Sequence, residues 1–280
     1  QKDGHRVVRL SRTGPAGADG ILWDPGAGRI DRDALARLSP DVIVNFAGEP
    51  IAHRWTAERR RRIRDSRVRG TTALAEAIAA LDRKPAVLLS GSAIGYYGTH
   101  RGDDVLDETG AASEDFLGEL ARDWERAAEP AAAAGVRVIL SRTGLVLGAA
   151  GGALRRMLLP FQAGVGGRLG DGRQWMSWIG LEDFVRAAPF AIGASDISGP
   201  VNFVAPEPVR NDEFTRVLAR VLGRPALLPV PRLALQMLFG EMADNTILAS
   251  QRVAPTILTG AGFKFRHPRL EEALRSELRR

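Results

Sequence analysis

Two serines and two adjacent tyrosines stand close together in the stretch Ala86–Gly98, AVLLSGSAIGYYG. A serine hydroxyl orients polar groups of a ligand, and a tyrosine phenol acts as an acid or base in proton transfer. The stretch opens with an apolar run that predicts a buried parallel strand over 86–89, followed by a Ser/Gly-rich turn. Ligands of open α/β sheets bind at the carboxyl ends of the strands, so chemistry is expected at this turn. The candidate catalytic residues are Ser92, Tyr96 and Tyr97.

A tyrosine followed by a lysine four residues later is the acid–base pair to look for in a reductase, because the lysine lowers the pKa of the phenol. The chain has only two tyrosines, and the residues four positions beyond them are His100 and Arg101. The three lysines stand at positions 2, 84 and 264, which do not fit this spacing. Any proton transfer therefore uses other groups.

An arginine, Arg12, comes soon after the first predicted strand, Arg6–Leu10. At the end of the second strand of a nucleotide-binding sheet, an acidic residue accepts from the ribose 2′-hydroxyl, whereas an arginine accommodates a 2′-phosphate. Arg12 therefore favours NADP over NAD. The alternative is an ordinary surface arginine, since all but three of the 39 basic residues are arginine.

A second arginine, Arg67, falls on the apolar stripe of a predicted long helix over 56–81, four residues after Ile63 and seven before Leu74. A buried or cleft-facing guanidinium needs an anionic partner. The alternatives are a role towards a ligand and an internal salt bridge.

The composition argues against several function classes. The 280 residues carry a formal charge of +6, but the arginines are spread over the chain, so nucleic acid is not an expected partner. The weaker alternative is a basic surface on the helix around 59–69. The chain has no cysteine and its four histidines are scattered, so no metal site is expected. No apolar run reaches membrane-spanning length; we expect no membrane partner and a cytoplasmic location.

Strands alternate with helices along the first part of the chain. This order predicts an α/β fold, a doubly wound parallel sheet with right-handed crossovers. From position 151 onward, glycine-rich loops, tryptophans and short helices predict a smaller α+β domain built on the sheet's carboxyl edge. Strands are predicted at 6–10, 21–23, 41–46, 86–89, 137–140 and 201–204, and helices at 32–38, 56–81, 114–134, 181–193, 211–222, 232–239 and 269–278.

Several ordered motifs together resemble one family, the epimerase-family atypical short-chain dehydrogenases/reductases that carry a C-terminal domain of unknown function. The resemblance covers essentially the whole chain. The motifs are NFAGEPI (45–51), RW (54–55), DSRVRGT (65–71), SGSAIGYYG (90–98), DFLGELARDWE (115–125), RTGLVLG (142–148), MLLPFQAGVGGRLGDGRQWMSWI (157–179) and AGFKFRHPRLEEAL (261–274).

The resemblance implies a Rossmann-type NADP-binding domain over 1–148 and 180–204, and a smaller substrate domain over 149–179 and 205–280. It implies that Ser11 and Arg12 hold the adenosine 2′-phosphate and that Arg67 reaches the cofactor from its helix. The remaining implied cofactor-binding residues lie along the adenosine, the pyrophosphate and the nicotinamide; they are Phe46, Ala47, Gly48, Ser90, Gly91, Thr143, Gly144 and Val146.

Two departures from the related proteins follow. Members of the group begin with a strand and a glycine-rich phosphate-binding loop, and neither precedes Gln1, so the natural protein is expected to be longer than this chain. The wider superfamily has a catalytic tyrosine and lysine at two positions that this chain fills with Phe116 and Leu120. This replacement matches the atypical group.

The leading hypothesis is an NADP(H)-binding, epimerase-like oxidoreductase that acts on an unidentified small molecule. The protein partner considered is a second copy of the chain, in a homodimer. In this hypothesis Ser92 orients a substrate oxygen, and Tyr96 or Tyr97 donates a proton. The alternative is a non-catalytic NADP(H) sensor that controls a protein partner, which the missing tyrosine–lysine pair favours.

Overall fold

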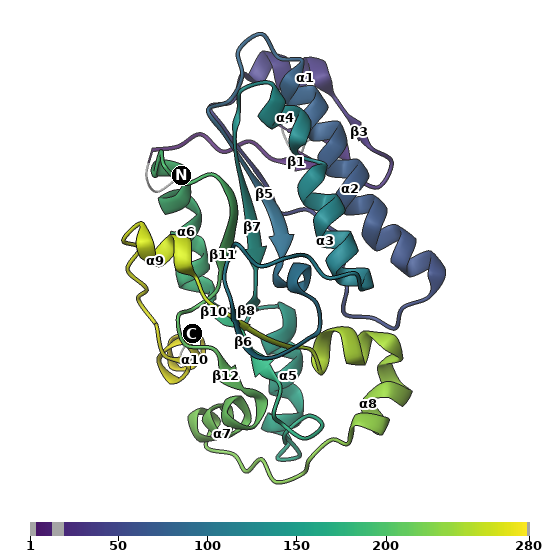
Figure 1. Ribbon diagram of the computed structural model, residues 1–280, viewed down its shortest axis with the longest axis vertical. Coiled ribbons are helices and arrows are strands. Elements are labelled where there is room, and N and C mark those ends of the chain that lie inside the picture. Colours follow the sequence, from purple (N-terminus) through teal and green to yellow (C-terminus); the bar gives the residue numbers. More distant parts are fainter. Residues whose placement is uncertain (1–3, 13–19, 279–280) are drawn as a thin grey trace. The chain divides into compact units, whose positions relative to one another are not determined.

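The computed structural model describes residues 4–12 and 20–278 of the chain (Figure 1). These residues form two compact units. Among the described residues, the first unit comprises 4–12, 20–51, 56–91 and 123–139, and the second comprises 52–55, 92–122 and 140–278. The units follow contacts rather than function, so the domain boundaries implied by the family resemblance stay a prediction.

The helices of the first unit begin where their capping residues predict. Asp31 accepts a hydrogen bond from the Ala34 backbone N–H at 2.8 Å, and the hydroxyl of Thr56 accepts from the Arg59 N–H at 3.1 Å. Such caps satisfy amide groups that have no partner in the first helical turn. The elements of this unit are β1 (Leu10–Ser11), β2 (Ile21–Asp24), β3 (Arg29–Ile30), α1 (Arg32–Leu38), β4 (Val42–Asn45), α2 (Ala57–Ala79) and α4 (Glu129–Ala133), with the first parts of β5 (Val87–Ala93) and β7 (Arg137–Thr143).

The strand β5 is longer than the sequence predicts. It pairs in parallel with β4 from Val42 opposite Val87 to Asn45 opposite Ser90, within a four-stranded sheet of order β11–β7–β5–β4. Its first six residues are all buried. The expected turn at Ser90 is wrong, because the buried strand stays extended through Ala93 and only then enters a 3₁₀ turn.

The predicted first strand is also wrong in its extent, because only Leu10 and Ser11 of this segment are in a strand. β1 pairs in parallel with β2, which pairs antiparallel with β3, and the three form a sheet of their own. On β4, Val42 and Val44 are exposed.

The second unit has its own apolar core, which includes Trp178, Phe161, Phe214 and Leu274. Three of its helices, α6, α7 and α8, have the predicted bounds. The elements that complete the unit are η1 (Ile94–Tyr97), β6 (His100–Leu106), the first part of α3 (Phe116–Arg126), β8 (Leu145–Leu147), α5 (Gly152–Gln162), β9 (Trp175–Met176), β10 (Trp178–Gly180), α6 (Leu181–Gly193), β11 (Gly199–Phe203), β12 (Val209–Arg210), α7 (Asn211–Leu222), α8 (Arg232–Phe239), η2 (Ala243–Ile247), β13 (Ser250–Val253), α9 (Thr256–Gly260) and α10 (Leu270–Leu278).

The helix predicted over 114–134 is interrupted. Pro130 has no backbone N–H and its ring conflicts with a continuing helix, so α3 ends at Arg126 and the short helix α4 starts again with the proline in its first turn. A proline is tolerated at a helix start, where its missing N–H leaves no unfilled partner.

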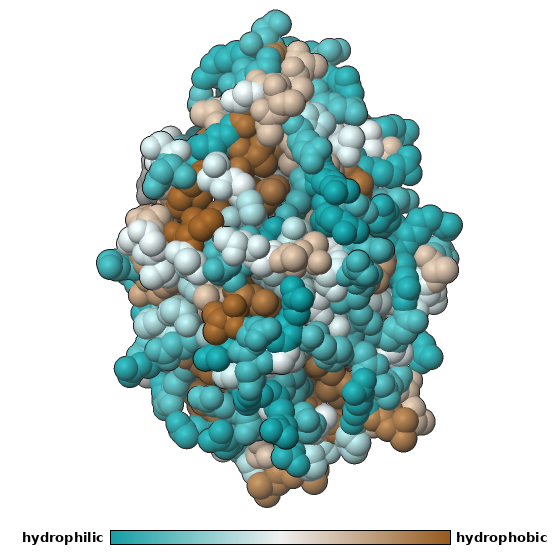
Figure 2. Space-filling model, viewed as in Figure 1, coloured by the Kyte–Doolittle hydropathy of each residue, from teal (hydrophilic) through white to brown (hydrophobic). Residues whose placement is uncertain are grey.

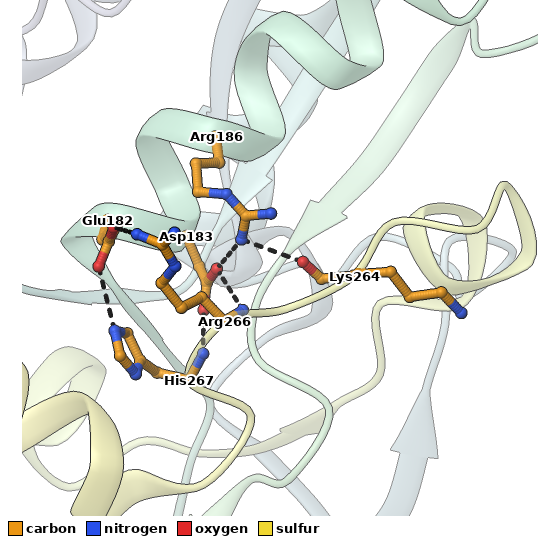
Figure 3. Close-up of polar contacts among 6 residues, drawn as sticks. All are labelled: Glu182, Asp183, Arg186, Lys264, Arg266 and His267. Carbon is orange, nitrogen blue, oxygen red and sulfur yellow. Dashed lines mark hydrogen bonds and ion pairs between the residues drawn. The ribbon is translucent and has the colours of Figure 1, made fainter.

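A fully buried carboxylate at the start of α6 fastens the C-terminal segment to that helix (Figure 3). Asp183 accepts hydrogen bonds from the backbone N–H groups of Arg266 at 2.8 Å and His267 at 2.9 Å, and from Nη1 of Arg186 at 2.8 Å. Beside it, Glu182 binds the side chains of Arg266 and His267. We call Asp183 and its three donors the Asp183 staple.

Replacing Asp183 by alanine is expected to lower the free energy of unfolding by about 3 kcal/mol, because buried N–H groups lose a charged acceptor. Urea unfolding measures this change, and Asp196→Ala is the matched control, since Asp196 is exposed. Equal stability of the two variants would show that the staple contributes nothing.

Candidate functional site

In the first unit, a cavity of about 640 Å³ lies against β1, β2 and β4. Of the residues predicted to bind a cofactor, Ser11, Phe46 and Ala47 line it. Arg12 follows Ser11 directly and is exposed. The other residues that line the cavity are Val8, Arg9, Leu10, Trp23, Ile43, Val44, Asn45 and Leu74.

A buried hydrogen-bond network shapes the chain where β4 ends. The Thr71 hydroxyl accepts from Nδ2 of Asn45 at 3.0 Å and from the indole Nε1 of Trp124, also at 3.0 Å. The side-chain oxygen of Asn45, Oδ1, accepts a hydrogen bond from the Ala47 N–H at 3.1 Å. The network therefore fixes the turn that carries the predicted residues Phe46, Ala47 and Gly48.

Arg67 lies beside this turn, and its guanidinium is hydrogen-bonded to backbone carbonyls rather than to a carboxylate. Its Nη1 donates to the carbonyl oxygens of Glu49 at 3.0 Å and Ile63 at 3.2 Å, and its guanidinium lies 5.1 Å from the ring centroid of Trp124. The Glu49 carboxylate is paired with Arg59 instead. Burial lowers the pKa of Arg67 to about 10, and the nearby Glu49 charge partly opposes this.

Two glycines allow the close approaches in this region. A Cβ at Gly48 would lie 2.8 Å from Cζ and 3.0 Å from Nη2 of Arg67. A Cβ at Gly91 would lie 2.7 Å from the Trp124 ring. Any larger residue at either position displaces the guanidinium or the indole, so the structure brings Gly48, Gly91 and Arg67 into one packed group.

Ser90 precedes Gly91 on β5. It is fully buried, and its Oγ has no hydrogen-bond partner in the described part of the chain. An orphaned buried hydroxyl costs free energy unless something satisfies it. Ser90 is therefore suited to bind a polar ligand atom.

In the second unit, a buried arginine organises the tyrosines. Arg142, at 3% exposure, donates through Nη1 to the Tyr97 hydroxyl at 3.1 Å and to the Glu108 carbonyl at 3.2 Å. The Tyr97 hydroxyl donates in turn to Oδ1 of Asn202 at 2.8 Å. Asn202 also donates its backbone N–H to the Glu108 carboxylate at 3.0 Å.

Both hydrogen bonds of the Tyr97 hydroxyl are therefore made to other protein groups. The side chain is fully buried, and burial raises the pKa of its phenol, although the hydrogen bond from Arg142 acts in the opposite direction. A phenol with this environment stays protonated and packs as part of the core. The geometry therefore favours a structural role for Tyr97 over the predicted proton donation.

Tyr96 has a different environment. Its ring lies face-on to Arg142, whose Cζ is 3.5 Å from the ring centroid, and the side chain is only half-buried. The two tyrosine rings meet edge to face, with centroids 5.5 Å apart. Ser92 is 4% exposed at the end of β5. Tyr96 is thus the tyrosine that retains an accessible surface.

The remaining predicted residues lie on β7, β8 and the link between them. Thr143 shares a hydroxyl–hydroxyl hydrogen bond of 2.8 Å with Ser141. A Cβ at Gly144 would lie 2.5 Å from the Ser177 carbonyl oxygen, so only glycine fits there without a shift. Val146 pairs with Ile179 in the β8–β10 ladder.

The places expected for a catalytic tyrosine and lysine hold apolar side chains in this structure. Phe116 packs edge to face on Trp55 with centroids 5.1 Å apart, and Leu120 is buried. Within the described residues, no group of three or more His, Asp or Glu side chains is arranged to hold a metal ion.

Comparison with known proteins bears on the whole chain. Residues 1–203 match a model of the NAD-dependent epimerase/dehydratase family, and residues 230–277 match a domain of unknown function. This chain belongs to the NAD-dependent epimerase/dehydratase family. It is thus a member of an NAD(P)-binding family and has a Rossmann-like α/β fold with a small C-terminal domain, as the sequence predicts.

Three similar proteins illustrate the match. An epimerase family protein of Mycobacterium tuberculosis is 46% identical over 271 residues, covering 96% of this chain and 88% of the relative. The crystal structure of human epimerase family protein SDR39U1 (isoform 2) with NADPH is 32% identical, with a TM-score of 0.87, and covers 99% of this chain and 92% of that one. The nucleoside-diphosphate sugar epimerase from Corynebacterium glutamicum is 36% identical, with a TM-score of 0.81, over 99% of this chain and 54% of that one.

Sequence reasoning missed two organising residues, one in each unit of this epimerase-family protein. Asn45 is a polar residue at the end of an apolar strand, and Arg142 is an arginine inside another. Each breaks the hydrophobic pattern of a buried strand, which is the signal that points to a buried polar role.

Replacing Tyr97 by phenylalanine is expected to cost about 1–2 kcal/mol of stability near pH 7, because Asn202 loses its donor. The folded-state pKa of Tyr97 is raised, so its contribution is complete below the unfolded pKa of about 10 and is lost as the pH rises through the folded value.

Urea unfolding at pH values from about 7 to 11 follows the stability difference between the wild type and Tyr97→Phe, which should narrow above about pH 10. Tyr96→Phe is the control, because it leaves the Tyr97 titration in place. A difference that stays constant to alkaline pH would contradict the assigned environment.

Proposed function

We propose that this epimerase-family protein binds NADP(H) and acts as an oxidoreductase or epimerase on a small molecule. The observation that carries the proposal is Arg67. Its guanidinium is desolvated, donates through Nη1 to two backbone carbonyls, and has Nη2 beside the backbone of Gly48. A phosphate that passes along this glycine backbone would supply the anion that the buried cation lacks.

Other residues of the first unit fit the same ligand. Small residues at 47 and 48 leave the turn after β4 open to close approach, and Ser90 offers an unsatisfied hydroxyl. Because residue 91 is glycine, the Trp124 ring can pack directly against the backbone of β5. The polar atoms of a dinucleotide at these positions would give the Ser90 hydroxyl a hydrogen-bond partner and the Arg67 guanidinium an anion.

The preference for NADP(H) over NAD(H) rests on Arg12 and Ser11. Arg12 is exposed directly after β1, and an arginine at this place recognises the 2′-phosphate. The human relative was crystallised with NADPH, which supports the same choice for this chain.

The bound cofactor would supply hydride donation or acceptance. Ser92, at the end of β5, would orient the oxygen of a substrate. Tyr96 would donate or accept the proton, and Arg142 would hold its ring in place through the stacking contact. Tyr97, Asn202 and Glu108 would keep Arg142 fixed. A cytoplasmic location belongs to this proposal and rests on composition.

A non-catalytic NADP(H) sensor is the second candidate. The observation that favours it is the apolar pair at Phe116 and Leu120, which removes the usual tyrosine–lysine machinery of the wider superfamily. In this case cofactor binding would control association with a protein partner, and Tyr96 would be dispensable.

Isothermal titration calorimetry with NADPH and NADH tests the cofactor assignment. Arg67→Met should weaken binding of both cofactors about tenfold or more, whereas Arg12→Ala should weaken NADPH binding selectively. Arg62→Met is the control on the same helix, where Arg62 is exposed and paired with Glu58. Equal affinities for the wild type and Arg67→Met would refute the phosphate role of Arg67.

The catalytic and sensor candidates differ in the effect of Tyr96→Phe. Loss of an acid–base group lowers turnover by about 100-fold or more. NADPH oxidation, followed by absorbance with a panel of carbonyl compounds, should show this loss while the NADPH affinity stays unchanged. Turnover that is indifferent to Tyr96→Phe and Ser92→Ala would remove both residues from the mechanism.

A further inference from the structure

The segment that leads into α8, together with α8 itself, leaves several large apolar side chains uncovered. Leu227 is 81% exposed, and Met237 is 71% exposed. Figure 2 shows the corresponding hydrophobic surface over α8 and the segment before it. We define the α8 patch as Leu227, Leu228, Leu233, Met237 and Leu238, each of which is more than half exposed.

The orientation of α8 explains how the patch arises. Leu235 is 4% exposed and anchors the helix to its unit. Leu233 and Met237 stand two residues to either side of it, about 200° around the helix, and therefore point away from the core. Isolated exposed leucines are ordinary, but several large apolar side chains exposed on one helix and the segment leading into it indicate an interaction site.

A neighbouring loop extends the same surface. The Leu228 N–H donates to the Gly166 carbonyl at 3.4 Å, which brings Val165, at 50% exposure, beside the patch. The Val230 N–H donates to the Arg168 carbonyl at 2.9 Å. Two chain segments that are distant in sequence thus contribute to one surface.

The exposed charges on the segment before α8 and on its neighbouring loop are cationic, whereas Arg232 on α8 pairs with Asp244 at 2.7 Å and Glu241 is exposed just after the helix. Arg224 and Arg168 are exposed and form no ion pair with an acidic side chain among the described residues. Arg54 donates to the Met237 carbonyl at 2.9 Å and is exposed at the other end of α8. Between Glu213 and Glu241 the sequence contains arginines but no acidic residue.

We propose that the α8 patch docks on a lipid surface that carries anionic phosphate headgroups. The leucine and methionine side chains would enter the boundary between headgroups and acyl chains, and the surrounding arginines would contact the phosphates. Cations around protruding apolar side chains match this surface in both charge and polarity.

Two other occupants fit the same observations less well. In a symmetric pair of copies, each arginine at the edge of the patch would meet the same cationic edge of the second copy. A partner's amphipathic helix needs a groove to receive it, whereas these side chains each show most of their surface outward. A fluid lipid surface imposes neither requirement.

The proposal departs from the expectation of no membrane partner, which was based on the length of apolar runs. No described helix is long and apolar enough to cross a membrane. Surface attachment needs only a short exposed face, and sequence periodicity does not reveal which apolar face stays uncovered.

The test is flotation of the whole chain with vesicles of phosphatidylcholine alone and of phosphatidylcholine mixed with phosphatidylglycerol. The protein should float with the mixed vesicles and about tenfold less with the neutral ones, and added salt should release it. The double substitution Leu233→Ser with Met237→Ser should abolish flotation, as should Arg224→Ser with Arg168→Ser.

The matched control is Val105→Ser with Val185→Ser, because both valines are 59% exposed elsewhere in the same unit. It should float like the wild type. Failure of the wild type to float would overturn the proposal. Flotation that the leucine and methionine substitutions leave unchanged would also overturn it, because binding would then arise from general basic charge. Patch-dependent self-association in ultracentrifugation without flotation would instead identify a second copy as the occupant.

Discussion

One shared hydroxyl governs the geometry of the turn after β4. Thr71 on α2 accepts hydrogen bonds from Asn45 at the end of β4 and from Trp124 on α3, and so joins three elements through a single buried atom. The position of Trp124 determines why residue 91 is glycine and where the Arg67 guanidinium rests. The loss of one buried hydroxyl would therefore affect strand, turn and cation together, because interior polar groups have few alternative partners.

A comparable arrangement occurs in the second unit, where the central group is a charge. Arg142 is buried against two aromatic rings and binds a phenol and a backbone carbonyl. Burying a guanidinium is costly unless hydrogen bonds and nearby negative charge compensate it. The carboxylate of Glu108 lies in the same network through Asn202, and the result is a rigid platform below Tyr96.

Much of the fold follows from local sequence rules. The bounds of α1, α6, α7 and α8 were predictable because caps, glycines and prolines mark their ends. The extension of β5 through Ser90 and Ala93 was not, because ladder pairing and burial outweigh the turn preference of serine and glycine. β6 was missed because its residues, rich in charge and glycine, become a strand only by pairing with β13, far along the chain.

The site shows the same division. The spacing of Arg67 against Ile63 and Leu74 correctly placed it on the buried side of its helix, because helical periodicity is a local property. The distinct environments of Tyr96 and Tyr97 were hidden, since adjacent residues of one turn face Arg142 differently and Asn202 comes from a remote strand. The predicted catalytic roles therefore depend on tertiary contacts that no local pattern contains.

The Asp183 staple also bears on how such proteins diverge. Two of its three donors are backbone N–H groups, which every residue except proline provides whatever its side chain. Substitutions at 266 and 267 other than proline therefore keep the hydrogen bonds to Asp183 and lose only the side-chain pairs with Glu182, whereas a substitution at 183 removes the acceptor itself. The attachment of the C-terminal segment to α6 thus tolerates changed side chains better at its donors than at its single buried acceptor.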